Sequence, residues 1–358
     1  MRAVTVNKAD GPDAITVEDR PVREPRPGEV RLRVAAAAVN PVDVFMWRRA
    51  VEPPFTPGMD AAGTVESLGH AGRRLTVGEP VMAVVSPWLP EGGAQAELVV
   101  VRAASVSPVP RGVSAPEAAT LPMNGLTALE GLRMLGLANG SALAVTGGAG
   151  LLASYVISLA RQRGIRVIAD AGPGDEALVS GFGADHVVPR GDGFADAVRE
   201  LVPGGADAVF DTAALTRAVL PAIRDGGAIA VVRGWDGGAP PGRGITVQAV
   251  SIGNALHNTA WLQHLADQVT AGRIRLRVAG LYPPERAVEA YLLMEAGGLR
   301  GRGVITFLPP GAVLRAEEAR GNYVIIVEQW RPSAVVSDDV AFGLAHVVVA
   351  ASIRPWCA

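Results

Sequence analysis

A glycine-rich turn between two apolar segments is the sequence feature that most constrains the fold. The residues Gly148-Ala149-Gly150-Leu151-Leu152-Ala153 follow the apolar run 142–146, a predicted buried strand, and lead into a long apolar helix predicted from about residue 153 to 163. This G-x-G-x-x-G/A spacing is typical of a strand–turn–helix unit that binds the pyrophosphate of a dinucleotide. The glycines permit a tight turn and close approach of the backbone, and the helix N-terminus offers N–H groups to the phosphates. An ordinary tight turn is the alternative interpretation.

The segments after this turn alternate between strand-like and helical patterns. Strands are predicted at 165–169, 187–188, 208–210 and 228–232, and helices near 194–202 and 255–271. This alternation predicts a doubly wound parallel sheet, the Rossmann fold, over residues 118–271. Asp170 falls at the end of the second strand, about 20 residues after the turn, where an acidic residue would bind the ribose. The predicted cofactor-binding residues are therefore Gly148, Ala149, Gly150, Leu151, Leu152 and Asp170.

The remaining segments predict a second, β-rich domain. Short apolar runs punctuated by Pro and Gly turns extend from residue 1 to 117, a pattern typical of a partly closed β-fold. The segment 272–307 contains a helical run and a terminal strand, and we expect it to return to this first domain. Residues 308–358 fit neither domain and form a C-terminal extension of unknown structure, with a β-prone run at 323–327 and an apolar run at 345–353.

The composition excludes several classes of protein. With a net charge of −2, the chain has no electrostatic case for binding nucleic acid or an anionic membrane. Cys357 is the only cysteine, so neither a disulfide framework nor a thiolate metal site is expected. No apolar run approaches about 18 residues and the start is strand-like, so we expect a cytoplasmic protein without a membrane partner. Lys8 is the only lysine among 33 basic residues, an arginine bias that indicates a GC-rich bacterial source.

Several short motifs in a fixed order give the chain a resemblance to a known family. They are Val39-Asn40-Pro41-Val42-Asp43, Pro57-Gly58-Met59-Asp60-Ala61-Ala62-Gly63-Thr64-Val65, Gly78-Glu79-Pro80-Val81, Ala119-Thr120-Leu121-Pro122-Met123-Asn124-Gly125-Leu126-Thr127-Ala128, the glycine turn, Gly183-Ala184-Asp185 and Gly301-Arg302-Gly303-Val304-Ile305. Over residues 1–307 the chain resembles the zinc-independent quinone oxidoreductase branch of the medium-chain dehydrogenase/reductase superfamily. The resemblance implies an α/β fold with a β-rich GroES-like catalytic domain (1–117 and 272–307), a Rossmann cofactor domain (118–271) and an active site in the cleft between them.

The resemblance also implies that zinc is absent. Zinc-dependent relatives carry a Cys ligand at the position of Asn40 and a His-Glu pair at the positions of Met59 and Asp60. The structural zinc loop with its four cysteines is missing as well. Because soft thiolate and imidazole ligands are lacking, we expect no zinc, and hydride delivery to a conjugated carbonyl or quinone is favoured over alcohol oxidation.

Family position places several candidate residues at the cleft. Asn40 and Thr127 are the predicted catalytic residues, since the Asn40 amide could hydrogen-bond a substrate carbonyl or the nicotinamide, and Thr127 would lie near the nicotinamide. The predicted substrate-binding residues are Phe45, Trp47, Asn124 and Trp235. Each candidate also has a structural interpretation: a turn residue for Asn40, helix-start chemistry for Thr127 and Asn124, and core packing for the tryptophans.

Two positions depart from the family pattern. Leu151 replaces a small residue, usually Gly, in the turn, and it crowds the cofactor side. Phe45 stands where several quinone-reducing relatives carry a Tyr near the substrate, so one possible proton donor is lost.

The cofactor preference depends on two residues with opposite effects. Asp170 favours a free 2′-hydroxyl and repels a 2′-phosphate, which favours NAD(H). Arg190 occupies a position that borders the adenosine in relatives, and its guanidinium could bind the 2′-phosphate. Following family habit, we expect NADP(H) rather than NAD(H).

These observations predict an NAD(P)H-dependent oxidoreductase that delivers hydride to a quinone or an activated enone without a metal. The cofactor carries the chemistry, and the protein supplies proximity, orientation and a dry cleft. The alternative is a redox-neutral biosynthetic enzyme or ligand-binding protein that keeps the scaffold and has lost hydride transfer. We expect a homodimer, because the apolar runs of the extension need cover.

Overall fold

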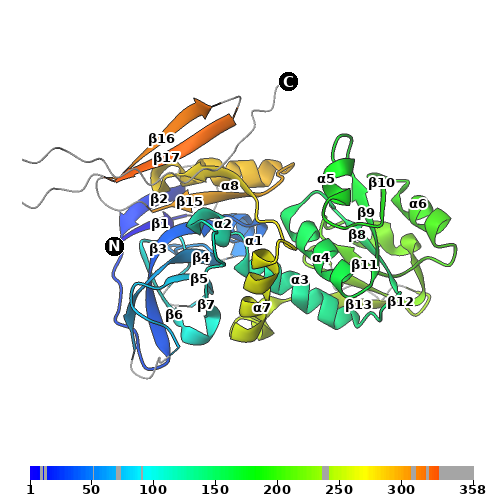
Figure 1. Cartoon of the computed structure of the whole chain (residues 1–358), viewed down its shortest axis with the longest axis horizontal. Helices are drawn as coiled ribbons and strands as arrows, with labels where there is room; N and C mark the ends of the chain where they lie inside the picture. Colours follow the sequence, from blue (N-terminus) through cyan, green and yellow to red (C-terminus); the bar gives the residue numbers. More distant parts are fainter. Residues whose placement is uncertain are drawn as a thin grey trace, which may run out of the picture.

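The computed structural model describes residues 1–8, 11, 14–50, 52–69, 74–89, 92–235, 242–307, 312–319 and 322–329. Most of them form two lobes that lie side by side, with helices α3 (Pro122–Leu135) and α7 (Thr259–Thr270) between the two sheets (Figure 1). The first lobe is built on a mostly antiparallel sheet and the second on a parallel sheet. The predicted fold class, a β-rich domain plus a doubly wound parallel sheet, is confirmed.

The first lobe contains a sheet of seven strands with β3 (Glu29–Ala38) near its centre. The other six strands are β4 (Asp60–Leu68), β5 (Pro80–Val84), β6 (Leu98–Arg102), β7 (Val106–Pro108), β14 (Val278–Tyr282) and β15 (Arg302–Thr306). Strand β3 pairs antiparallel with β4, β6 and β15. Val30, Leu32 and Val34 are buried on one face, as expected for alternating side chains of a half-buried strand. Strands β1 (Arg2–Val6) and β2 (Ile15–Asp19) form a separate two-stranded sheet.

Helix α1 (Pro41–Phe45) starts directly after β3 and carries the first candidate residues. Asn40 is its N-cap, and the Asp43 carboxylate accepts a hydrogen bond from the Asn40 backbone N–H at 2.8 Å. Pro41 occupies the first turn, where its fixed φ and missing N–H are tolerated. The remaining helical segments of this lobe are η2 (Met46–Ala50), η3 (Ala103–Ser105), α2 (Ala115–Ala118), η6 (Pro284–Arg286) and α8 (Ala287–Ala296).

The second lobe contains six parallel strands in the order β10-β9-β8-β11-β12-β13. Their bounds are β8 (Ala142–Thr146), β9 (Arg166–Ala171), β10 (His186–Pro189), β11 (Ala206–Asp211), β12 (Ile223–Val231) and β13 (Thr246–Ala249). The helical segments between them are α4 (Leu151–Gln162), α5 (Glu176–Ser180), α6 (Phe194–Leu201) and η4 (Thr216–Ala222), and η5 (Ile252–Asn254) follows β13. The order reverses between β8 and β11, and ligands bind at such a switch point, outside the carboxyl ends of the strands.

Strand β8 shows why this sheet is covered on both faces. All five of its residues are buried. Leu143 and Val145 belong to the hydrophobic cluster that includes α4, whereas Ala144 belongs to the cluster that includes Phe194 of α6. Successive side chains therefore point to opposite faces, and each face is covered by helices, as is usual for parallel sheets.

After α7 the chain returns to the first lobe. Strand β15 pairs with β3, opposing Val304 to Ala38, and β14 pairs with β15. Beyond it, β16 (Ala312–Ala319) and β17 (Asn322–Gln329) form an antiparallel pair. The predicted β-prone run 323–327 lies within β17, and the predicted apolar run at 345–353 lies outside the described residues. In the described part of the chain, no helix is long and apolar enough to cross a membrane.

Candidate active site

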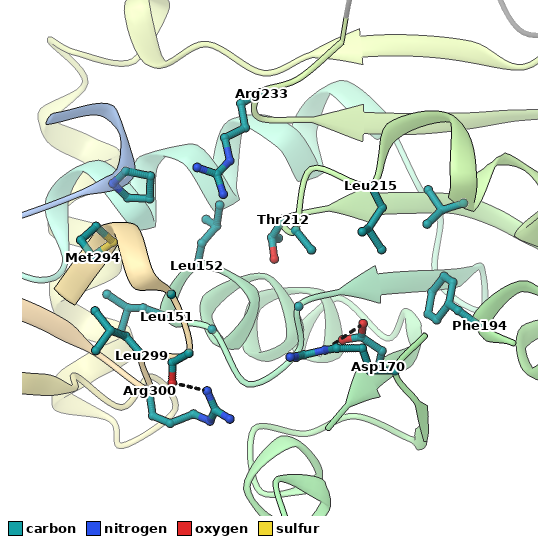
Figure 2. Close-up of a pocket in the computed structure, with 18 of the residues that line it drawn as sticks. Leu151, Leu152, Asp170, Phe194, Thr212, Leu215, Arg233, Met294, Leu299 and Arg300 are labelled. Carbon is teal, nitrogen blue, oxygen red and sulfur yellow. Dashed lines mark hydrogen bonds and ion pairs between the residues drawn. The ribbon is translucent and has the colours of Figure 1, made fainter. Parts of the chain in front are cut away.

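A cleft of about 660 Å³ lies where the two lobes meet, at the carboxyl ends of the parallel strands. Its lining residues come from both lobes and fall within the segments 41–44, 147–152, 170–195, 212–233 and 294–302. In Figure 2, Leu151 and Leu152 lie in the middle of the cleft, Arg233 lies at one end and Asp170 with Phe194 at the other. A cleft of this size and position can hold an extended ligand.

The predicted glycine turn connects β8 to α4 and forms the middle of this cleft. Gly147 has a left-handed φ of 66°, and a Cβ there would meet the Thr212 hydroxyl oxygen at 2.9 Å. A Cβ on Gly148 would meet the Asp170 carbonyl oxygen at 2.3 Å, so only glycine fits both positions. Gly150 is the N-cap of α4 and provides no side chain to cap the first N–H groups. The start of α4 can therefore bind an anion through its backbone.

Arg277, from the segment that precedes β14, fixes the other side of the turn. Its guanidinium donates hydrogen bonds to the carbonyl oxygens of Ala149 at 3.0 Å and Gly150 at 2.9 Å, and to the Ser154 hydroxyl at 3.1 Å. It also stacks over the Phe182 ring at 4.6 Å. Burial lowers the pKa of Arg277 to about 10, so it stays charged near neutral pH. A segment of the returning chain thus orients the peptide groups of the turn.

Asp170 lies at the end of β9, as predicted, but its carboxylate is directed at the turn. The Oδ1 atom accepts a hydrogen bond from the Gly148 N–H at 2.8 Å, and the side chain is almost fully buried. The Arg190 guanidinium lies 3.6 Å from the other carboxylate oxygen and is 43% exposed. Burial raises the pKa of Asp170, and the Gly148 N–H and Arg190 act in the opposite direction. The Arg190 guanidinium is therefore more exposed to a ligand in the cleft than the Asp170 carboxylate is.

A loop between α8 and β15 closes one side of the cleft. Gly297 and Gly298 both have left-handed φ values, 75° and 72°. The Arg300 guanidinium forms a two-pronged ion pair with Asp175 in the second lobe, with a first contact of 2.7 Å. Figure 2 shows Leu299 and Arg300 on this loop beside Leu151. This ion pair connects the two lobes across the cleft.

A buried polar network lies under the first-lobe wall of the cleft. The Asn40 amide donates to Asp60 Oδ2 at 2.7 Å and accepts from the Asn124 amide at 2.9 Å. The Arg302 guanidinium donates to Asn40 Oδ1 at 2.9 Å and to Asn124 Oδ1 at 2.8 Å. The Met123 backbone N–H donates to the second Asp60 oxygen at 2.6 Å. The network thus joins α1, β4, α3 and β15.

The two carboxyl groups in and beside this network, Asp60 and Asp43, are fully buried. Burial raises the pKa of Asp60 to about 7, and burial together with the nearby Asp60 charge raises the pKa of Asp43 to about 7. Burial also lowers the pKa of Arg302 to about 10. All four carboxylate oxygens accept N–H donors, which stabilises the ionised forms. Two acids and one guanidinium thus share a dry site where charge is costly unless it is hydrogen-bonded.

The donor set at this site does not fit zinc. The residues at the positions of the zinc ligands are Asn40, Met59 and Asp60, and both Asp60 carboxylate oxygens already accept hydrogen bonds. The Arg302 guanidinium lies within 2.9 Å of Asn40 Oδ1, so a cation already occupies the neighbourhood. Zinc sites in proteins use thiolate, imidazole and free carboxylate ligands. The described residues contain no group of three or more His, Cys, Asp or Glu that could hold a metal ion.

The other candidate residues lie at varied depths. Thr127 is 8% exposed, and its hydroxyl donates to the Met123 carbonyl oxygen at 2.7 Å. Trp47 is buried in the first-lobe core, edge-on to Tyr291 with ring centroids 5.8 Å apart. Phe45 is 55% exposed on the surface. Trp235 is half-buried under the Arg217 guanidinium, 4.7 Å from its ring centroid.

The structure brings some predicted site residues together and leaves others outside the cleft. Gly150, Leu151, Leu152, Asp170 and Arg190 line it. The predicted residues that do not line it are Asn40, Phe45, Trp47, Asn124, Thr127, Gly148, Ala149 and Trp235. Sequence reasoning missed Gly147, Arg233, Arg277, Arg300 and Arg302. Only Gly147 and Arg302 had a signal, because one precedes the glycine pattern and the other stands inside the Gly301–Gly303 motif.

Two family models match the chain. The Alcohol dehydrogenase GroES-like domain matches residues 26–111, within the first lobe. The Zinc-binding dehydrogenase model matches residues 182–305, which cover the later part of the parallel sheet and the return to the first lobe. The second match begins within the parallel sheet and ends in β15, so it spans parts of both lobes.

Known proteins resemble the chain over most of its length. An NADPH-dependent alkenal/one oxidoreductase, chloroplastic, of Arabidopsis thaliana is 29% identical over 323 residues, covering 86% of this chain and 80% of that protein. A 2-haloacrylate reductase of a Burkholderia species is 28% identical, covering 86% of this chain and 99% of that protein. The solved structure of a mycobacterial quinone oxidoreductase is 28% identical with a TM-score of 0.72, covering 86% of this chain and 100% of that chain.

A β-rich domain joined to a doubly wound sheet, with a glycine turn opening into the cleft between them, defines a two-domain dinucleotide-dependent dehydrogenase or reductase. Within this class the chain belongs to the medium-chain dehydrogenase/reductase superfamily, in its quinone oxidoreductase-like branch.

Proposed function

We propose that this protein is an NAD(P)H-dependent oxidoreductase that reduces an activated enone or a quinone without a metal. The observation that carries the proposal is the uncapped start of α4, which opens at Gly150 into a cleft shared by both lobes. The similar proteins named as alkenal/one and quinone oxidoreductases support the same class of acceptor. The Asn40–Asp60–Arg302 network, which does not fit zinc, favours carbonyl or quinone reduction over metal-assisted alcohol oxidation.

The chain's own residues supply binding, orientation and exclusion of water. A bound reduced nicotinamide would supply the hydride. The backbone at the start of α4 would hold the pyrophosphate, with its peptide groups oriented by Arg277. Leu151 and Leu152 present an apolar wall to the cleft, which limits water. The described lining residues include no His, Lys, Tyr or Cys, and the lining carboxylates Asp170 and Glu295 are paired with arginines. We therefore expect water to donate the proton that completes the reduction.

Turnover with defined acceptors tests this function. The purified protein should oxidise NADPH in the presence of simple benzoquinones, naphthoquinones or linear enones, and it should not reduce NADP⁺ with primary alcohols. Transfer of deuterium from one face of C4-labelled cofactor would establish direct hydride delivery. Tight cofactor binding without turnover on the whole panel would favour the redox-neutral alternative, and absence of binding would contradict both.

We further propose that NADPH is preferred over NADH. The Asp170 carboxylate is buried against the turn, so it is poorly placed to bind a ribose hydroxyl, while the Arg190 guanidinium is partly exposed at the cleft. An Arg–phosphate contact is a strong, charge-assisted interaction. Arg190→Gln should therefore weaken NADPH binding by about 10-fold and leave NADH affinity nearly unchanged, as measured by quenching of tryptophan fluorescence. Equal effects on both cofactors would contradict this preference.

The remaining features of the proposal concern assembly and composition. We propose a cytoplasmic homodimer, for which β13, the last strand in the order of the parallel sheet, offers one edge for pairing. We also propose the domain division 1–117 with 272–307, then 118–271, with residues 308–358 dispensable for catalysis. Sedimentation analysis tests the homodimer, elemental analysis tests the expected absence of zinc from the purified protein, and the activity of a chain ending near Pro309 tests whether the extension is dispensable.

A further inference from the structure

Arg233 is a cation in the cleft that the binding of a dinucleotide does not explain. It follows the end of β12, and its side chain is exposed and lines the cleft. In Figure 2 its guanidinium points from the end of the strand into the cleft, on the side of Leu152. No hydrogen bond or ion pair joins its side chain to any residue in the part of the chain that the structure describes. An exposed guanidinium aimed into a ligand cleft is available to an anion.

The order of the strands indicates which part of the ligand Arg233 faces. The order β9-β8-β11-β12 places Asp170, the turn, Thr212 and Arg233 in sequence along the edge of the sheet. In doubly wound sheets the adenosine ribose lies at the end of the second strand and the pyrophosphate at the first turn. Arg233 lies two strands beyond the turn, on the side away from Asp170. Two strand spacings correspond to about 10 Å between the turn and Arg233. It is therefore at the nicotinamide half of the cleft, where an acceptor must lie.

The charges at this end of the cleft are unbalanced. The lining carboxylates are Asp170, Asp192 and Glu295. Asp170 pairs with Arg190, and Glu295 forms an ion pair with Arg48 at 2.6 Å. Asp192 lies two residues after Arg190, on the Asp170 side. The charge of Arg233 instead contributes to the lowering of the Arg302 pKa, so these two guanidiniums repel one another at the same end. A bound anion would relieve this repulsion.

We propose that Arg233 is a specificity-determining residue that binds a carboxylate on the acceptor, so that the preferred substrate is an anionic conjugated carbonyl compound. This inference rests on the proposed reductase function. The planar guanidinium suits two parallel hydrogen bonds to a carboxylate, and the cleft offers this ligand a positive field.

The reaction balances without a change at the carboxylate. Hydride from the reduced cofactor forms a C–H bond at the β-carbon of the conjugated carbonyl. The double-bond electrons move to the carbonyl oxygen, and the resulting enolate takes a proton from water at the α-carbon. The acceptor is reduced by two electrons, the cofactor is oxidised, and the carboxylate stays bound to Arg233 throughout.

Matched acid and ester substrates test this specificity. The probes are trans-4-oxopent-2-enoate and its methyl ester, which share the enone and differ in charge. Arg233→Gln removes the charge and keeps a polar side chain of similar length. The ratio of kcat/KM for the acid to kcat/KM for the ester should fall about 10-fold or more in the variant, through KM for the acid. Comparison of this ratio between proteins cancels the different intrinsic reactivity of the two probes.

Two controls separate specificity from general damage. Arg111→Gln removes the charge of an exposed arginine that does not line the cleft, and it should keep the wild-type ratio. The dissociation constant for NADPH should stay within about twofold in Arg233→Gln, because the pyrophosphate is held at the turn. Raising the salt concentration should increase KM for the acid and not for the ester in the wild type.

The outcomes distinguish this proposal from the proposed function. An unchanged acid-to-ester ratio in Arg233→Gln overturns the role of Arg233 while the reductase function stands. Equal losses for acid and ester with weaker NADPH binding would assign Arg233 to the cofactor and also overturn the proposal. If the wild type binds NADPH and reduces neither probe, calorimetric titration of the NADP⁺ complex with the acid measures directly whether Arg233 contributes to binding of the acid. Weaker binding of the acid by Arg233→Gln then supports the carboxylate site, and equal binding or none by the wild type refutes it.

Discussion

Replacing Arg302 by Met should destabilise the first lobe strongly. Arg302 is 7% exposed and is the guanidinium of a network that contains the buried acids Asp43 and Asp60. It donates to both Asn40 Oδ1 and Asn124 Oδ1. Met fills a similar volume but donates no hydrogen bond and carries no charge.

The magnitude follows from the bonds that are lost. Two hydrogen bonds from a charged donor contribute about 1.5–3 kcal/mol each, and breaking a buried charged group's pairing typically costs about 3–5 kcal/mol. Better burial of the Met side chain offsets part of this loss. We therefore expect the free energy of unfolding to fall by about 3–5 kcal/mol and the melting temperature by about 10 °C.

The effect should also depend on pH. A carboxyl whose folded-state pKa is raised above its unfolded value contributes stability that is fully present below about pH 4 and is lost as pH rises through the folded-state pKa, here about 7. Removing the Arg302 cation raises these pKa values further. The wild type then stops losing stability near pH 7, whereas the variant goes on losing it above pH 7. The difference in melting temperature between them should be larger at pH 8 than at pH 6.

Thermal melts followed by circular dichroism at pH 6 and pH 8 provide the measurement. The matched control is Arg286→Met, which removes an exposed guanidinium from its ion pair with the exposed Glu289 and should leave the melting temperature close to that of the wild type. A destabilisation below about 1 kcal/mol, or one that is the same at both pH values, would refute the argument that Arg302 compensates buried carboxylates.

Two further predictions concern the glycine turn. Gly150→Asp should abolish NADPH binding, because its carboxylate repels the pyrophosphate. The φ of −67° at this N-cap suits Asp, but the added Cβ would lie 3.0 Å from the Gly147 carbonyl oxygen, so the matched control is Gly150→Ala, which adds the same Cβ without the charge. The two variants should have similar melting temperatures, and Gly150→Ala should bind NADPH more tightly. Equal NADPH affinity in Gly150→Asp and the wild type would mean that the turn is only structural. Arg277→Met should raise the dissociation constant for NADPH about 5-fold to 10-fold, since the carbonyl groups of Ala149 and Gly150 lose their donor, and Arg277→Lys should recover part of the loss. Unchanged binding in Arg277→Met, measured by the same fluorescence titration, would show that the turn holds its geometry without this contact.

The fold could be predicted from the sequence because its signals are local. The strand at 142–146, the glycine turn and the apolar helix lie next to each other in the chain, and their periodicity and turn chemistry are each visible in a short window. Boundaries were less accurate: α4 begins at Leu151 rather than at 153, because Gly150 already serves as the N-cap. Strand β12 begins at Ile223, earlier than the predicted 228, since residues 224–226 are polar or glycine and carry no strand pattern.

The site could be predicted only where local sequence defines it. Gly150, Leu151 and Leu152 line the cleft as expected, because a glycine turn before a helix fixes its own geometry. Asn40 and Asn124 are 84 residues apart, and they hydrogen-bond each other and Arg302. Their place in a buried network therefore depends on tertiary contacts that no short stretch of sequence contains. Arg233 and Arg277 could not be distinguished from the other arginines, since arginine fills nearly all basic positions of this chain.

The pairing of β15 with β3 has a consequence for the way the chain folds during synthesis. Residues 36–38 of β3 pair with β4 along one edge, but their other edge is paired only when residues 304–306 leave the ribosome, long after β4 and β6 have been made. The whole parallel sheet is synthesised in between, and it can fold as a unit of its own while the first lobe still carries an open edge. An open edge of this kind can pair with another chain, so slow translation or early termination before residue 302 should yield aggregation-prone fragments. Because β15 is the last of its strands to be made, the sheet of the first lobe can be completed only in a chain that has been translated through both lobes.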